Sequence, residues 1–78
     1  MKDRRLREAR MEMKWEDGFT IRVGRCGRAV CLSANREGLL SLAGQLTALA
    51  AEAPGSHIHY DDSNSLEDGS EELIIEKL

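Results

Sequence analysis

Two histidines and an aspartate at alternate positions are the residues of this chain best placed to do chemistry. His57, His59 and Asp61 are each separated by one residue, and alternate side chains of a β-strand point to the same side. Such a set can chelate zinc, but a catalytic zinc normally has three protein ligands plus water, and the chain holds no other histidine. We predict no metal site here and favour a solvent-facing polar strand or a contact with a partner.

The two cysteines offer little to an enzyme. Cys26 and Cys31 lack the CxxC spacing and are too sparse for a disulfide scaffold, so in a reducing compartment we expect two free thiols. His57 or His59 could act as a base toward Cys31 if the fold brought them together, but a small side chain filling a strand is the favoured interpretation. The glycine-rich stretch Gly24–Arg28 precedes an expected strand rather than a helix and lacks the Lys-Ser/Thr ending of a phosphate-binding loop. We predict a protein that is not an enzyme and has no cofactor.

Charge is concentrated in the last third of the chain. Residues 52–78 carry eight acidic side chains and one lysine, a net −7, whereas the whole chain has a net charge of −3. The overall charge disfavours nucleic acid, and the acidic segment favours a basic protein partner. The predicted partner-binding residues are His57, His59, Asp61, Asp62, Glu67 and Asp68.

Alternating apolar residues predict three strands before a helix. Residues 11–16 and 19–24 alternate in this way, and a three-residue loop at 16–18 keeps their apolar members on one face, with Gly18 in the left-handed conformation. This register pairs Trp15 with Phe19. A two-residue turn at Cys26-Gly27 then pairs Val23 with Val30 and Ile21 with Leu32 in the third strand.

A helix is expected over residues 36–52. Asn35 is a suitable N-cap and Pro54-Gly55 ends the element. Leucines recur at spacings of three and four and predict one buried seam; they are Leu39, Leu42, Leu46 and Leu49. Gly38 and Gly44 each cost about 1 kcal/mol relative to alanine, which suggests a close approach to the sheet or a helix held mainly by its packing.

These elements make a two-layer α+β domain. Two further strands are expected at residues 56–60 and 71–77, joined by a polar loop. The predicted fold is one helix packed on a mostly antiparallel four- or five-stranded sheet, with the last strand between the third and the fourth. Only one face of that sheet is expected to be covered. Residues 1–10 form a flexible basic lead-in, and residues 11–78 form the single domain.

Composition also bears on location and assembly. The 78 residues contain no apolar run near the roughly 20 residues that a bilayer span needs, and no apolar block follows the basic start as in a secretory signal. We expect a bacterial cytoplasmic protein that does not enter a membrane. It would be a monomer or a weak homodimer, the latter through a face lined by Ala29, Cys31 and Ser33.

Three motifs resemble a known family. They are NREGLLSLA at residues 35–43, HIHYD at 57–61 and LEDGSEELII at 66–75. Over residues 33–76 the chain resembles the small bacterial immunity proteins numbered family thirty-two of polymorphic toxin systems, whose members share an NxEGLxxLA helix start, a histidine-aspartate strand and a glycine-serine ending. The resemblance implies an α+β protein without catalysis that binds and neutralises a toxin from a competing or sibling cell. A zinc module or hydrolase centred on His57 and His59, and a self-associating structural module, remain the alternatives.

Overall fold

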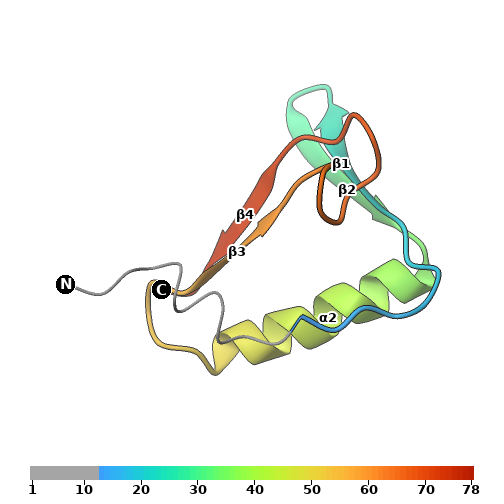
Figure 1. Ribbon diagram of the computed structural model, residues 1–78. Coiled ribbons are helices and arrows are strands. Elements are labelled where there is room, and N and C mark those ends of the chain that lie inside the picture. Colours follow the sequence, from blue (N-terminus) through green and yellow to red (C-terminus); the bar gives the residue numbers. More distant parts are fainter. Residues whose placement is uncertain (1–12) are drawn as a thin grey trace.

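A computed structural model describes residues 13–78 (Figure 1). Its elements are β1 (Ile21–Cys26), β2 (Ala29–Ala34), α2 (Arg36–Ala50), β3 (His57–Tyr60) and β4 (Leu73–Glu76). The strands form two antiparallel pairs, β1 with β2 and β3 with β4. The α+β class is as predicted, but two small two-stranded sheets replace the expected single sheet of four or five strands. The proposed lead-in, residues 1–10, lies outside the described residues.

The first predicted strand is wrong for residues 13–16; residues 11 and 12 lie outside the described part. The predicted turn does form, since the Phe19 amide donates to the Glu16 carbonyl at 3.2 Å and Gly18 has a φ of 79°. The Trp15 and Phe19 rings also stack, with centroids 4.4 Å apart. However, residues 13–16 make no strand ladder, because side chains of α2 bind their backbone.

Two hydrogen bonds attach this segment to the helix. The Glu16 amide donates to Ser41 Oγ at 2.8 Å, and Gln45 Nε2 donates to the Lys14 carbonyl at 2.8 Å. Buried polar groups need partners of this kind. Ser41 and Gln45 are therefore among the buried residues of α2, although the apolar pattern did not select them.

The predicted register of the β1–β2 hairpin is shifted by two residues. Cys26 pairs with Ala29, so the turn residues are Gly27 and Arg28 rather than Cys26 and Gly27. Gly27 has a φ of 65°, and a glycine at the first turn position is typical of type II′ hairpins. Val23 consequently pairs with Leu32. Because the shift is even, each residue keeps its predicted face.

The segment before β4 lies along β1 and connects the two sheets. The Glu67 amide donates to the Ile21 carbonyl at 2.8 Å, and the Glu71 amide donates to the Val23 carbonyl at 2.8 Å. The Val23 amide in turn donates to Ser70 Oγ at 3.2 Å. The last part of the chain therefore borders β1, not the following strand β2 as predicted.

The core lies where α2, β1 and β3 meet. Its buried apolar residues are Ile21, Val23, Leu42, Leu49, Ile58, Tyr60 and Leu66. The leucine seam predicted on α2 is half wrong, because Leu39 is 54% exposed and Leu46 is 43% exposed, whereas Leu42 and Leu49 are buried. The helix is rotated so that Gly38 faces the sheet.

Gly38 explains this rotation. A Cβ at this position would collide with the Thr20 carbonyl oxygen and would lie 2.9 Å from Ile21 Cγ1. The predicted close approach is therefore correct for Gly38. At Gly44 a Cβ would meet nothing within 4 Å, so that glycine is not required by packing. Within residues 13–78 there is no helix with the length and apolar character needed to cross a membrane.

Candidate functional site

The strand β3 divides its side chains between the core and the outer surface. Ile58 and Tyr60 are buried, whereas His59 is exposed and His57 is half-buried. In the β3–β4 pairing His57 lies opposite Glu76 and His59 lies opposite Ile74. The predicted alternation is correct, and both imidazoles lie on the face turned away from the core.

The two imidazoles are neighbours and one has an acidic partner. Their ring centroids are 4.9 Å apart. His59 Nδ1 lies 3.4 Å from Glu72 Oε2, with both side chains largely exposed. An exposed pair of this kind contributes little to stability, and the Glu72 carboxylate is accessible to a partner. Glu72 was not among the predicted site residues, although its position just before the last strand placed it near His59.

Tyr60 fixes β3 from the inside. Its hydroxyl donates to Gln45 Oε1 at 2.7 Å, and its ring meets the Trp15 ring edge-on at 6.3 Å between centroids. Burial raises the pKa of Tyr60 to about 12, because the phenolate would lose its hydration. The neutral phenol thus holds β3 against α2. This contact also fixes where the outward side chains of His57 and His59 lie.

Asp61 shapes the loop that follows β3. Its Oδ1 accepts from the Ser63 amide at 3.0 Å and from Ser63 Oγ at 2.9 Å. Its carbonyl accepts from the amides of Ser65 and Leu66. The hydrogen bond from the Ser63 side chain is the main reason that the pKa of Asp61 is lowered. Asp61 is therefore a turn-forming residue as well as a candidate contact.

The remaining predicted carboxylates lie on a segment that is tied to β1. Asp62 and Asp68 are exposed and Glu67 is half-buried. Leu66 is 6% exposed and inserts into the core, while Arg22 Nη1 donates to the Asp68 carbonyl at 3.3 Å. These carboxylates, together with those of Glu71 and Glu72, are therefore attached to a backbone that several tertiary hydrogen bonds hold in place. We term the set Asp61, Asp62, Glu67, Asp68, Glu71 and Glu72 the acidic surface.

A hollow of about 320 Å³ lies beside this strand. It is lined by Met13, Trp15, His57, Ile58, His59, Asn64 and Ser65. Across residues 13–78, no three side chains of His, Cys, Asp or Glu come together in a way that could hold a metal ion. The geometry therefore gives the zinc alternative two imidazoles but no complete ligand set.

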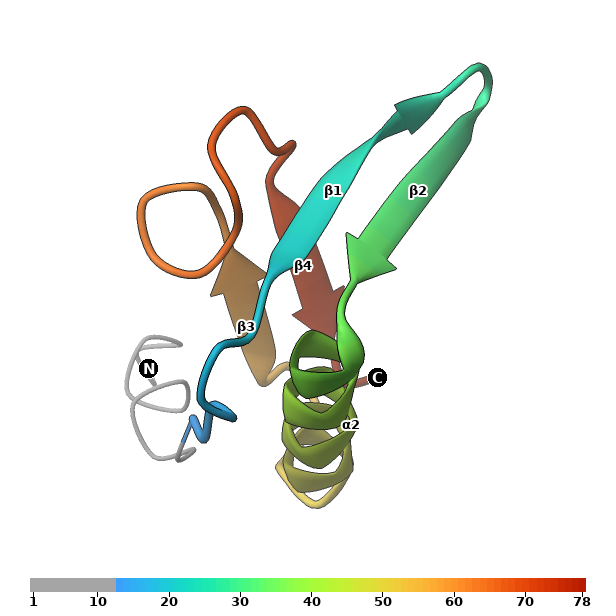
Figure 2. The same ribbon diagram turned by 90° about the vertical axis from the view of Figure 1, so that its right-hand side faces the viewer.

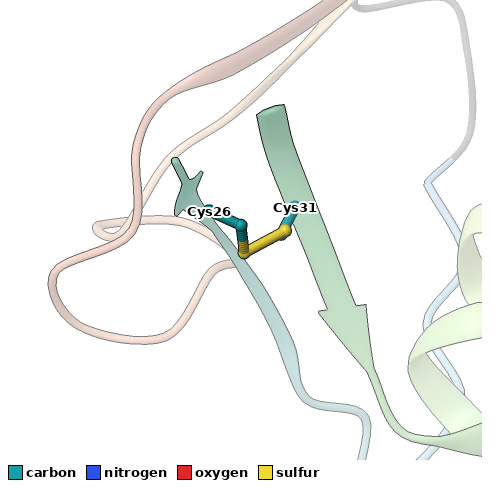
Figure 3. The surroundings of a disulfide bond; sticks show 2 residues. All are labelled: Cys26 and Cys31. Atoms are coloured by element: carbon teal, nitrogen blue, oxygen red, sulfur yellow. A yellow bond between two sulfur atoms is a disulfide. The ribbon is translucent and has the colours of Figure 1, made fainter. Parts of the chain in front are cut away.

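The prediction of two free thiols is wrong. Cys26 and Cys31 form a disulfide across the β1–β2 hairpin, with their Cα atoms 5.9 Å apart (Figure 3). The shifted register explains why: Cys31 lies opposite Gly24 and Cys26 opposite Ala29, so the cysteines are diagonal neighbours on one face. The 5.9 Å between their Cα atoms lies within the range of disulfides. In this state Cys31 has no thiol that could act as a nucleophile.

The comparison with known families agrees with the motifs. The model of the family Immunity protein 32 matches residues 29–78, well over half of the chain. The chain belongs to the Immunity protein 32 family. No curated protein and no solved structure matches it. The resemblance predicted from the sequence is confirmed.

The part that matches Immunity protein 32 begins at the first residue of β2 and includes α2, β3 and β4. All six predicted contact residues lie inside it, as does Cys31, whereas β1 and Cys26 lie before it. The acidic surface is therefore carried by the part of the chain that the family model describes.

Proposed function

We propose that this member of the Immunity protein 32 family is a non-enzymatic immunity protein that binds and neutralises a cognate bacterial toxin. The observation that carries the proposal is the family match, which spans every candidate contact residue. The proposed contacts are the outward histidines of β3 and the acidic surface, namely His57, His59, Asp61, Asp62, Glu67 and Asp68. Neutralisation needs no catalytic group in the immunity protein, only a surface that blocks the toxin.

The acidic surface suits a basic partner. Residues 52–78 have a net charge of −7, and complementary charge raises the rate at which two proteins meet. The backbone of the acidic surface is bonded to β1 through Glu67 and Glu71. A surface that is already ordered loses less conformational entropy on binding, which favours a tight complex.

Binding and rescue of growth test this proposal directly. The test begins with the neighbouring reading frames, where we expect a large secreted protein with a C-terminal toxin domain. That domain is the probe, made in an inactive form for calorimetry and in an active form for growth assays. We expect a one-to-one complex and rescue of growth when both chains are co-expressed. Growth arrest that persists despite abundant immunity protein would contradict the proposal.

A matched pair of variants locates the surface. Asp62→Asn with Asp68→Asn removes two exposed carboxylates of the acidic surface, and the pair should weaken binding by about tenfold, since rim charges act mainly on association. Glu16→Gln with Asp17→Asn also removes two exposed carboxylates, here from the turn before β1, and should leave the affinity unchanged. Equal effects of the two changes would place the contact elsewhere.

The compartment is part of the same proposal. Composition favours the cytoplasm, whereas structural disulfides persist in oxidising compartments. Cell fractionation tests the location independently of the thiols: the protein should remain with the cytoplasmic contents when the periplasm is released by osmotic shock. Release together with the periplasmic contents would place the protein outside the cytoplasm.

A further inference from the structure

The outer edge of β2 has no strand beside it in the described part of the chain. Within residues 13–78, β2 pairs only with β1, and the other edge of β1 is taken by the backbone of Glu67 and Glu71. In Figure 2, β2 accordingly lies at the open side of the hairpin. Among the described residues, one edge of the small sheet is covered by the backbone of residues 67–71 and the other edge has no backbone partner.

The register determines which backbone groups of β2 face outward. In a hairpin with a two-residue turn, the residues that flank the turn form a hydrogen-bonded pair, and such pairs then alternate along the ladder. Cys26 and Ala29 flank the turn, so the amides and carbonyls of Val30 and Leu32 point away from β1. The outer edge of β1 follows the same rule. There the backbone groups of Ile21 and Val23 point away from β2 and form hydrogen bonds with residues 67–71.

The side chains of this edge are apolar on one face and small on the other. Val30 is 61% exposed and Leu32 is 40% exposed, while Ala29, Cys31 and Ser33 alternate with them on the opposite face. Edge strands are usually protected by lysine, proline, a bulge or a cover. In β2 the six residues contain no lysine or proline and pair regularly, so the edge remains competent to pair.

The charge around this edge is positive. Between Gly18 and Asn35 the chain has three arginines and no acidic residue. Arg25 and Arg28 lie at the turn end and are exposed. Arg36, at the other end of β2, forms an ion pair with Glu37 at 3.8 Å, so the positive charge is concentrated at the turn. A second copy of the chain would bring its own arginines to the contact, and like charges across paired strands are destabilising. An acidic segment would instead be complementary.

We propose that the outer edge of β2 binds an extended acidic segment of another protein by strand addition. The segment would form backbone hydrogen bonds with Val30 and Leu32 and place its apolar side chains beside theirs. Arg25 pairs with Val30 and shares its face, so a carboxylate at the end of the segment, on that same face, would lie near Arg25 and Arg28. Main-chain bonds supply affinity in this mode, and alternate side chains supply specificity. The Cys26–Cys31 disulfide ties the hairpin together and so lowers the cost of ordering it. This inference does not depend on the toxin or on the acidic surface.

Amide hydrogen exchange of the full chain tests the proposal. The probe is a capped seven-residue peptide with glutamate at positions 1 and 7, valine at 3 and 5 and threonine between them, so that glutamates and valines share one face. Its control replaces each glutamate with lysine. With the acidic peptide in excess, we expect exchange at Val30 and Leu32 to slow on the order of tenfold, because added strand bonds protect outward amides. The lysine peptide should have no effect. Slowing by both peptides equally, or by neither, would overturn the proposal.

Two variants separate strand addition from loss of folding. Val30→Pro removes an outward amide without removing a β1–β2 bond, since proline is tolerated at outward positions of edge strands, and it should abolish binding of the acidic peptide. Val30→Thr keeps the amide and should retain binding. Sedimentation of the chain alone tests whether a second copy of the chain occupies this edge instead. A dimer in which the amides of Val30 and Leu32 are already protected would refute the acidic partner.

Discussion

At the scale of single residues, the buried contact between Tyr60 and Gln45 links the surface strand to the helix. Gln45 is 2% exposed and Tyr60 is fully buried, and Gln45 uses its amide nitrogen for Lys14 and its oxygen for Tyr60. Both polar ends of the side chain are therefore satisfied, as buried amides require. Neither contact could be predicted from apolar periodicity, because a glutamine in a helix is ordinarily assigned to the solvent side.

Tyr60→Phe should destabilise the fold by about 1 to 3 kcal/mol, because Gln45 Oε1 would be left buried without its donor. Urea unfolding followed by tryptophan fluorescence measures the loss. The double variant Tyr60→Phe with Gln45→Leu tests the cause, since removing both partners should recover part of the stability. An unchanged midpoint for Tyr60→Phe would show that the hydrogen bond contributes nothing.

The same tyrosine predicts a response to alkaline pH. The pKa of Tyr60 is raised from 10.0 to about 12 in the folded protein. Its stabilising effect is therefore complete below pH 10 and is lost as the pH rises from 10 through about 12, by roughly 2 to 3 kcal/mol. Denaturant midpoints measured across this window should fall in the wild type. The fall should be smaller in Tyr60→Phe, and parallel curves for the two proteins would contradict the assignment.

The two helical glycines predict opposite effects of the same substitution. Gly38→Ala places a Cβ against the Thr20 carbonyl and Ile21, and overpacking of this kind costs about 1 to 3 kcal/mol. Gly44→Ala meets nothing within 4 Å and should stabilise the helix by up to about 1 kcal/mol. Thermal unfolding of the two variants compares them, and equal shifts would mean that Gly38 is not a contact point.

At the scale of elements, the sequence predicted the helix and the two C-terminal strands but not how they meet. Local signals suffice for the helix start at Asn35, whose Oδ1 accepts from the Gly38 amide at 2.8 Å, and for the alternation of β3. The prediction of the buried side of α2 was wrong because it relied on the spacing of leucines, which includes Leu39 and Leu46, and gave no weight to Gly38. The close approach at Gly38 and the long-range hydrogen bonds of Gln45 to the Lys14 carbonyl and of the Glu16 amide to Ser41 both favour that side. No local pattern reports these contacts.

The candidate site shows the same division. The outward direction of His57 and His59 follows from strand alternation, whereas the turn role of Asp61 and the proximity of Glu72 depend on tertiary structure. The disulfide was missed because the predicted register placed Cys31 opposite Arg22 and the thiols were assigned by compartment. A register shifted by two residues places the cysteines diagonally across the hairpin.

Removal of the disulfide should weaken the hairpin. In the double variant Cys26→Ser with Cys31→Ser, the free energy of unfolding should fall by about 2 kcal/mol, the value expected for so short a loop. Guanidinium unfolding measures the change, and thiol titration of the wild type should detect no free thiol until a reductant is added. Two reactive thiols in the freshly purified, unreduced protein would contradict the bond.

At the scale of the whole molecule, opposite charges lie on different segments of the chain. The hairpin of β1 and β2 carries arginines without acidic residues, and residues 52–78 have a net charge of −7. The acidic surface should therefore prefer a basic partner and the β2 edge an acidic one. Binding at both should weaken as salt screens the charges.

Salt dependence measured separately on each surface tests this arrangement. Binding of the toxin domain should weaken as sodium chloride rises from 50 to 500 mM, roughly ten- to a hundredfold, with most of the change in the association rate. The double variant Asp62→Asn with Asp68→Asn should reduce that slope, while Arg28→Gln should not. An affinity independent of salt would remove electrostatic attraction from the proposed function.

The junction at the end of the chain has a practical consequence for such measurements. Lys77 exchanges backbone hydrogen bonds with Gly55 and Ser56, and its ammonium group donates to the Ala50 carbonyl. The next residue, Leu78, is 96% exposed and lies at the opposite end of the molecule from the β1–β2 turn and the loop before β4 (Figure 1). A tether attached after Leu78 would therefore anchor the chain to a sensor chip by a firmly held end and leave the β2 edge and the loop before β4 facing the solution. His57, which lies opposite Glu76, would be the proposed contact nearest to the tether.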